Sequence, residues 1–140
     1  QYKSLLMSEN FELHAQLGKD SIWLADWPLC QLRLINDSNY PWFILVPRRA
    51  DIRDVIDLSD EEQAQLWQES AKLSRLLRQK FSPEKLNLAA LGNMVPQLHL
   101  HHVARFSSDA AWPSPIWGKV AAIPYTEQQL VVLLNEWSVA

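Results

Sequence analysis

The chain has 140 residues, of which 48% are apolar and 21% are charged, and its formal net charge is −3. These values are typical of one globular domain, exclude an eight-fold barrel and disfavour a protein that coats nucleic acid through a basic surface. The single cysteine, Cys30, excludes an internal disulfide and multi-cysteine zinc patterns. No window is apolar enough to span a membrane, and the first residues lack the order of a secretory signal, so we expect a soluble protein of the cytoplasm.

The first half of the chain predicts a short helix followed by three strands. Residues 10–17 place apolar side chains at helical spacing, and a glycine follows them as a terminator. Residues 21–25 and 30–36 read as strands, the second with the apolar–polar alternation of a half-buried strand. The polar cluster at 36–39 predicts a turn, and the apolar run 42–46 between two prolines predicts a central strand covered on both faces.

The second half predicts two helices and two more strands. A serine and a glutamate three residues apart form a capping box at the start of a long helix over 60–81, which carries a stripe of leucines. Strands are expected over 86–91 and 97–105, and a second capping box, Thr126 with Gln129, opens a final helix. This order predicts an α+β fold in which an antiparallel sheet of about five strands carries a long helix and a C-terminal helix.

The strand expected over residues 97–105 carries three of the four histidines in the chain. Because successive side chains of a strand point to opposite faces, Gln97, His99 and His101 share one face, while the intervening leucines share the other. A row of two imidazoles and an amide is costly to bury without partners. We therefore expect this row to line a pocket or to contact solvent.

Three readings fit the histidine row. Two histidines on one strand face can clamp a metal, but such a site needs three or four ligands, and only the distant His14 and the downstream Asp109 are at hand. A neutral imidazole, with an ordinary pKa of about 6.5, is a nucleophile suited to phosphorus at physiological pH. The third reading is a purely structural row of hydrogen-bonded side chains. The alternation favours the nucleophile, and a lone histidine such as His14 is expected to be a surface or packed residue.

The row resembles the signature of the histidine triad (HIT) superfamily of nucleotide hydrolases and transferases, in which three histidines alternate with apolar residues. Gln97 stands at the position of the first histidine, His99 at the middle one and His101 at the third, and Arg105 matches the arginine that closes the motif. The histidine row alone suggests this family, and neighbouring segments of the sequence resemble it as well.

Four further segments resemble family elements in the same order: the strand end that holds the ribose, the strand after it, the opening of the long helix and the loop before the triad (residues 34–36, 42–47, 58–62 and 92–96). The similarity covers residues 11–105. We therefore expect residues 1–140 to form one HIT-like domain, with 106–140 as its C-terminal loop and helix.

The resemblance implies a homodimer that binds nucleotides in a cleft of each subunit, without a metal or another cofactor. His99 would attack the α-phosphate to give a nucleotidyl-histidine that water hydrolyses, and His101 and Gln97 would be its catalytic partners. The implied substrate-binding residues are Asn36 at the ribose, Asn93 at the phosphate and the closing arginine (Arg105).

Three departures from the family pattern qualify this expectation. The amide of Gln97 donates and accepts hydrogen bonds but cannot carry a charge, so a nucleotide-binding or regulatory protein with weak or no catalysis is the alternative. Met94 stands where some members have a hydroxyl, and a thioether cannot donate a proton to an amine leaving group. This favours phosphoanhydride substrates such as dinucleoside polyphosphates. Ala104 replaces the usual proline, which removes stiffness more than chemistry.

Two further features have alternative interpretations. His102 falls on the leucine face, where we expect a packed histidine, and a bulge that turns it towards the site is the alternative. Residues 112–118 hold two of the seven tryptophans in a loop with two prolines. Such a loop could cover a nucleotide base, pack across a dimer interface or join the core.

Overall fold

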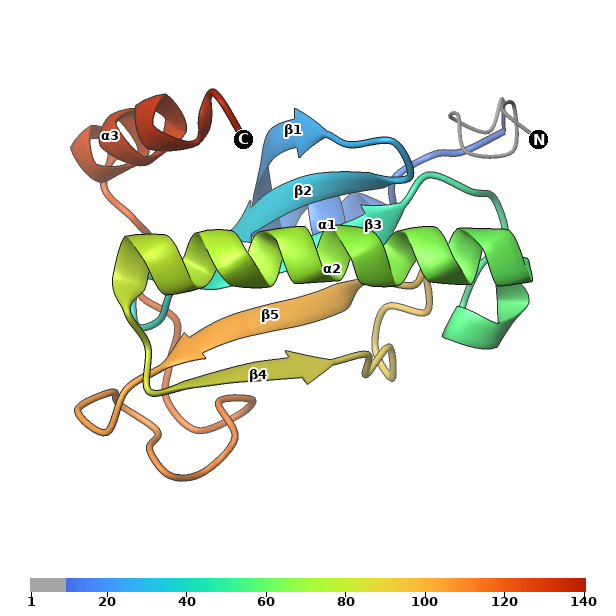
Figure 1. The fold of residues 1–140 in the computed structure, drawn as a ribbon. Helices are drawn as coiled ribbons and strands as arrows, with labels where there is room; N and C mark the ends of the chain where they lie inside the picture. Colours follow the sequence, from blue (N-terminus) through green and yellow to red (C-terminus); the bar gives the residue numbers. More distant parts are fainter. Residues whose placement is uncertain (1–9) are drawn as a thin grey trace.

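The structure is a computed structural model, and it describes residues 10–140. The elements in chain order are α1 (Ala15–Asp20), β1 (Ser21–Asp26), β2 (Cys30–Ile35), β3 (Trp42–Pro47), the 3-10 turn η2 (Val55–Asp57), α2 (Asp60–Phe81), β4 (Lys85–Ala89), β5 (Leu100–Arg105) and α3 (Glu127–Trp137). The strands form one antiparallel sheet in the order β1-β2-β3-β5-β4 (Figure 1). The predicted α+β fold is confirmed. The expectation of no secretory signal concerns residues 1–9, which lie outside the described part.

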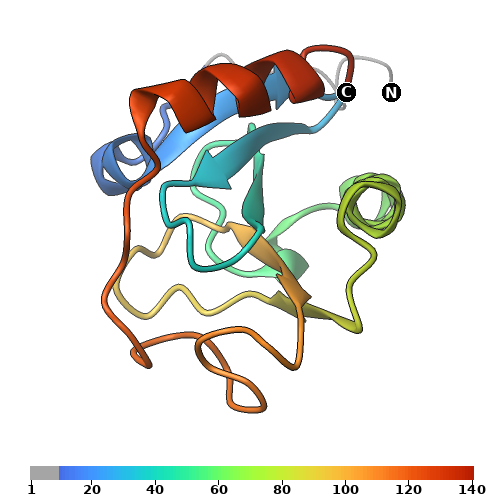
Figure 2. The ribbon, with the colours of Figure 1, turned by 90° about the vertical axis from the view of Figure 1, so that its left-hand side faces the viewer.

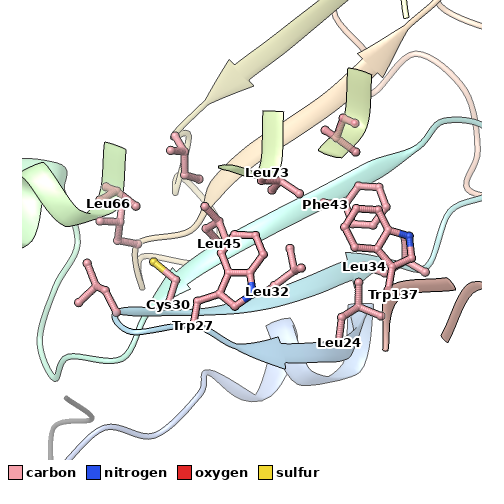
Figure 3. Packing of buried hydrophobic residues seen from close by; sticks show 14 of the residues in the cluster. Leu24, Trp27, Cys30, Leu32, Leu34, Phe43, Leu45, Leu66, Leu73 and Trp137 are labelled. Atoms are coloured by element: carbon pink, nitrogen blue, oxygen red, sulfur yellow. The ribbon is translucent and has the colours of Figure 1, made fainter. Parts of the chain in front are cut away.

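The two faces of the sheet are covered by different parts of the chain. Helix α2 crosses one face, while α1 and the segment that leads from β5 to α3 lie on the other side (Figure 2). The main core lies under α2, where its leucines meet alternate side chains of β2 and β3 (Figure 3). Trp137 joins α3 to this core, because its ring lies 4.6 Å from that of Phe43.

The central strand β3 is buried on both faces, as its continuous apolar run predicts. Phe43 and Leu45 belong to the core under α2, whereas Ile44 and Val46 pack on the opposite face with Leu17 of α1. Since β2 and β5 flank it on either side, β3 has no free edge. This strand therefore fixes the position of β5 and of the histidines that β5 carries.

Both predicted capping boxes are present. The Ser59 hydroxyl accepts from the Glu62 N–H at 3.1 Å, and the Glu62 carboxylate accepts from the Ser59 N–H at 2.9 Å. Thr126 and Gln129 make the same reciprocal pair at the start of α3. Each box satisfies N–H groups that a helix N-terminus leaves unpaired. No helix within residues 10–140 combines the length and the apolar character that crossing a membrane requires.

Helix α1 begins later than the sequence pattern predicts. The predicted helix over 10–17 is wrong at its start, because His14 is the N-cap and its Nδ1 accepts from the Gln16 N–H at 3.0 Å. It is also wrong at its end, because the helix runs through Gly18 to Asp20 and the glycine does not terminate it. The backbone N–H of His14 donates instead to the side chain of Gln97 at 2.8 Å, which takes it out of the helix. The side chains of residues 11 and 13 are still partly buried against the sheet. The apolar pattern over these residues therefore indicates burial and does not indicate a helix.

Strand β5 also starts later than expected, at Leu100 instead of residue 97. Its neighbours offer pairing only from that point, since Leu45 of β3 pairs with Leu100 and Ala89 at the end of β4 pairs with His101. The N–H of Leu98 donates to the carbonyl of Ile52 at 2.9 Å, outside the sheet. The histidine row therefore begins in the loop that enters the strand.

Candidate active site

A cavity of about 700 Å³ opens beside α1, on the side of the sheet opposite α2. Its walls come from α1, the end of β2, the loop at residues 91–95, the histidine row and the segment around residues 117–124. Most of the lining surface is apolar, and His99 and His101 are among its polar residues. A cavity of this size and character suits a ligand as large as a nucleotide.

His99 presents one free ring nitrogen to this cavity. Its Nδ1 lies 2.8 Å from the backbone carbonyl oxygen of Gln97. A carbonyl only accepts hydrogen bonds, so Nδ1 carries the proton and the Nε2 of the neutral ring keeps a lone pair. Within residues 10–140, that Nε2 has no hydrogen-bond partner. The loop backbone therefore selects the tautomer in which His99 is a nucleophile.

His101 lies beside His99 and is held in the opposite tautomer. The two ring centroids are 4.8 Å apart, with an interplanar angle of 68°. The indole N–H of Trp42 donates to Nδ1 of His101 at 2.9 Å. Because an indole nitrogen only donates, Nδ1 of His101 holds the lone pair, and Nε2 of the neutral ring holds the proton. Trp117 closes the group, with its ring 5.2 Å from that of His101.

Both rings are held neutral at pH 7. Burial lowers the pKa of His99, an effect that the Gln97 carbonyl opposes and a positive charge on His14 increases. Burial lowers the pKa of His101 to about 3, with further contributions from His99 and His102. The site therefore contains a neutral nucleophile and a neutral donor, side by side.

The side chain of Gln97 is turned away from the main cavity. Its Oε1 accepts from the N–H of His14 and its Nε2 donates to the carbonyl of Glu12, each at 2.8 Å. Gln97 and His14 line a second, smaller cavity of about 330 Å³. The amide thus binds the segment that precedes α1, while the backbone carbonyl of the same residue orients His99.

Asn36 and Asn93, for which the resemblance implies contacts with the ribose and the phosphate, both line the cavity. The Oδ1 of Asn36 accepts from the N–H of Tyr125 at 2.9 Å, which leaves its amide N–H groups for a ligand. The neighbouring Asp37 accepts from the N–H of Ile123 at 3.2 Å. These two hydrogen bonds hold the segment at residues 121–125 beside the end of β2, where Ala122 and Pro124 form part of the cavity wall.

Arg105 lies outside the lining of the cavity. Its guanidinium is buried and donates to both carboxylate oxygens of Asp109, at 2.8 and 3.1 Å, and to the side chain of Asn87 and the carbonyl of Ser114. Burial acts to raise the pKa of Asp109, but hydrogen bonds from Arg105 and backbone N–H groups outweigh it and lower the pKa to about 2. The structure brings Arg105 to the loop after β5 and not to the lining of the main cavity.

His102 lies on the α2 side of the sheet, away from His99 and His101. Its Nδ1 donates to the carbonyl of Leu100 at 3.1 Å, and its Nε2 accepts from the hydroxyl of Ser70 at 2.7 Å. The side chain is completely buried. Burial lowers its pKa to about 4. His102 is thus the packed histidine that the alternation predicts.

Several cavity residues were not predicted from the sequence as parts of a site. Trp42 shares a sheet face with His101, and extending the strand alternation to the neighbouring strand would have found it. Trp117 belongs to the 112–118 loop, for which covering a nucleotide base was one of the interpretations, whereas the approach of residues 121–125 depends on contacts distant in sequence, for which no local signal exists. Within residues 10–140, no three His, Cys, Asp or Glu side chains are grouped so that they could hold a metal ion.

A family model for the HIT domain matches residues 16–108. The chain belongs to the HIT family. The family is one of nucleotide-binding proteins and hydrolases, and the matched region includes the whole sheet and the histidine row. The segment at residues 117–124, which walls the cavity, lies outside the match.

Three crystal structures of histidine triad proteins resemble this HIT protein closely. The one from Marinobacter aquaeolei VT8 is 47% identical, with a TM-score of 0.88, over 90% of this chain and 92% of that one. The protein from Bradyrhizobium japonicum is 44% identical, with a TM-score of 0.87, over 89% and 93% of the two chains. The protein from Sinorhizobium meliloti 1021 is 41% identical, with a TM-score of 0.87, over 90% and 93%. Among curated proteins there is no significant match.

Proposed function

We propose that this HIT protein is a nucleotide hydrolase or nucleotidyl transferase that works through His99. The observation that supports this proposal most is the hydrogen bond from Nδ1 of His99 to the carbonyl of Gln97, which leaves Nε2 as a free nucleophile on the cavity. A neutral imidazole attacks phosphorus without further activation. The cavity is large enough to hold a nucleotide against it.

The reaction proceeds in two displacements at the α-phosphorus. The Nε2 lone pair of His99 forms an N–P bond while the bond from phosphorus to the bridging oxygen breaks, and that oxygen leaves with the electron pair. Water then forms a P–O bond, the N–P bond breaks, its electron pair returns to Nε2, and the water proton passes to solvent. In the intermediate the ring is positively charged, and the hydrogen bond to the Gln97 carbonyl stabilises that charge.

The remaining cavity residues contact different parts of the nucleotide. Asn36 donates to the ribose and Asn93 to a phosphate oxygen, and the apolar walls, including Trp117, contact the base. Met94 lines the cavity without a proton to donate, which favours phosphoanhydride substrates of the dinucleoside polyphosphate class over amine leaving groups. The protein is a homodimer of the cytoplasm in this proposal. Sedimentation equilibrium of the purified protein measures its molar mass in solution and so tests the dimer.

A second candidate is a nucleotide-binding or regulatory protein with weak or no turnover. One observation favours it: both ends of the Gln97 amide are occupied by the backbone of residues 12 and 14, so this side chain contributes nothing to the phosphate. This candidate predicts nucleotide affinity without product across a wide substrate panel.

The test is incubation of the protein with diadenosine tetraphosphate, followed by chromatography of the products and intact-mass analysis of the protein after a rapid acid-free quench. We expect release of adenosine monophosphate and a protein species heavier by one adenylyl group. Both signals should disappear in His99→Ala, with circular dichroism as the check on folding. Undiminished turnover in His99→Ala would contradict the mechanism. Loss of activity in excess chelator would instead support a metal-dependent enzyme.

A further inference from the structure

Trp42 and His101 form a hydrogen-bonded side-chain pair in the main cavity. Besides the hydrogen bond of 2.9 Å, their ring centroids lie 5.8 Å apart at an angle of 44°. The ring of Trp117 lies edge-on to both, 5.2 Å from His101 and 6.2 Å from Trp42. His101 is only 5% exposed. Its ring therefore cannot turn over without losing the indole hydrogen bond inside a closed aromatic group.

The hydrogen bond has a chemical direction. The indole N–H of Trp42 has no lone pair to offer, so the pair exists only while Nδ1 of His101 is unprotonated. A protonated ring would place its own N–H against the indole N–H. Trp42 thus selects one tautomer of His101, in the same way that the Gln97 carbonyl selects the other tautomer of His99.

We propose that Trp42 is a positioning residue that keeps His101 as a neutral hydrogen-bond donor, with Nε2–H available to the phosphoryl group that His99 attacks. This inference rests on the proposed function. It assigns a role to Trp42, which lies on β3 and outside the run of residues that carries the histidine signature. The two adjacent rings then have complementary tasks. His99 offers a lone pair, and His101 offers a proton to a phosphoryl oxygen on which charge develops.

The surroundings of His101 agree with a neutral role. Burial is the largest of the causes that lower its pKa to about 3, and the neighbouring histidines His99 and His102 act in the same direction. The facing residues from β3 and from the 106–125 segment are tryptophans, which do not titrate. The charged groups on the same cavity are Lys19, Asp20 and Asp37, and none of them is among the causes that shift the pKa of His101. Among the described residues, no carboxylate is hydrogen-bonded to His101 to favour its cationic form.

The experiment compares Trp42→Phe with Trp117→Phe. Both variants shorten an aromatic side chain of the same group, but only Trp42→Phe removes an N–H that is bonded to His101. Long-range nitrogen–proton NMR spectra of the ¹⁵N-labelled free protein, recorded from pH 5 to 8, report the protonation of each imidazole nitrogen. His101→Ala and His99→Ala identify the signals.

In the wild type we expect His101 to show an unprotonated Nδ1 and a protonated Nε2 throughout this pH range. In Trp42→Phe we expect a mixture of tautomers and the start of a titration at the acid end, while Trp117→Phe keeps the wild-type pattern. In turnover of diadenosine tetraphosphate, Trp42→Phe should lower kcat by about tenfold or more with a smaller change in KM, because the donor acts on the transition state.

A protonated Nδ1 on His101 in the wild type would overturn the inference even if neither variant folds. The wild-type tautomer pattern of His101 in Trp42→Phe, or a kcat in Trp42→Phe equal to that of the wild type, would also overturn it. If the wild type shows the expected tautomer pattern but turns over no nucleotide, the proposed function fails, while the control of His101 by Trp42 stands. The NMR measurement needs no substrate, so the two failures are distinct.

Discussion

The backbone carbonyl of Gln97 lies 2.8 Å from Nδ1 of His99, two residues further along the chain. The hydrogen bond is local, yet it depends on the irregular course of the chain before β5. In a regular strand this carbonyl would point to a neighbouring strand, but here β5 begins only at Leu100. The late start of the strand thus provides the acceptor that defines the tautomer of His99.

The first prediction concerns the pH dependence of turnover. Burial lowers the pKa of His99 below the ordinary value for histidine. As the pH falls through that lowered pKa, Nε2 gains a proton and loses its lone pair. We therefore expect kcat/KM to stay constant through pH 6.5 and to fall only under more acidic conditions. A pH profile of initial rates measures this, with intrinsic fluorescence to exclude acid unfolding. A decline centred at or above pH 6.5 would contradict it.

The second prediction concerns His14→Asn. When His14 carries a positive charge, which requires its Nδ1 to give up the hydrogen bond from the Gln16 N–H, that charge lowers the pKa of His99, so removal of the imidazole should shift the acid decline of kcat/KM to higher pH. Asparagine is a good N-cap and can still accept from the Gln16 N–H, so α1 should persist. His14→Ala is the matched control, which removes both the charge and the cap and should cost about 1 kcal/mol of stability. An unchanged profile in both variants would show that the charge does not act on His99.

The third prediction separates the side chain of Gln97 from its backbone. Gln97→Ala removes two hydrogen bonds to the segment before α1, which should cost about 1 to 3 kcal/mol and accelerate amide exchange over residues 11–17. The carbonyl that orients His99 remains, so turnover should fall far less than in His99→Ala. Exchange mass spectrometry and kinetics on the same sample measure both effects. Turnover as low as in His99→Ala, with normal exchange, would instead make the Gln97 side chain catalytic.

The sequence predicts the fold well where the signals are local. The capping boxes at Ser59 and Thr126 locate both long helices, and the run between Pro41 and Pro47 locates the central strand. The errors occur where a distant partner takes a backbone group. His14 leaves the predicted helix because Gln97, 83 residues away, accepts its N–H.

The candidate site was predictable only in part, for a related reason. The alternation of His99 and His101 holds, and both line the cavity together with Asn36 and Asn93. The same alternation fails for Gln97, since its amide turns to the segment before α1. The aromatic group around His101 combines parts of β3 and of the segment after β5, and a single sequence contains no signal for such contacts.

The fourth prediction concerns Asp109→Asn. Asp109 is the carboxylate partner of the buried Arg105, whose side chain is only 2% exposed. Neutralising the carboxylate leaves the guanidinium without a counter-charge in the interior, which should lower the free energy of unfolding by about 3 kcal/mol or more. Urea denaturation measures this loss. Ser108→Asn, at the exposed neighbouring position, is the control and should change stability by less than about 0.5 kcal/mol. Equal stability of the two variants would show that the pair contributes little.

The fifth prediction concerns acid stability. The pKa of His102 is about 4 in the folded protein, below the ordinary 6.5, so the unfolded chain takes up a proton first as the pH falls. Stability should therefore decrease between pH 6.5 and 4, by on the order of 3 kcal/mol from this residue. Burial of His101 acts in the same direction.

The matched variant for this prediction is the double substitution His102→Leu with Ser70→Ala. It removes both members of the hydrogen bond between Ser70 and His102 at once, so neither side chain is left without its partner, while the Leu100 carbonyl loses the proton that Nδ1 donated to it. Urea denaturation at pH 7, 5.5 and 4.5 should show a smaller loss of stability in the double variant than in the wild type. Parallel stability curves for the two proteins would mean that His102 takes up its proton in the folded state as easily as in the unfolded chain. In that case the Ser70 hydroxyl would have to turn and accept from a charged ring, and the neutral pair described for the core would be incorrect.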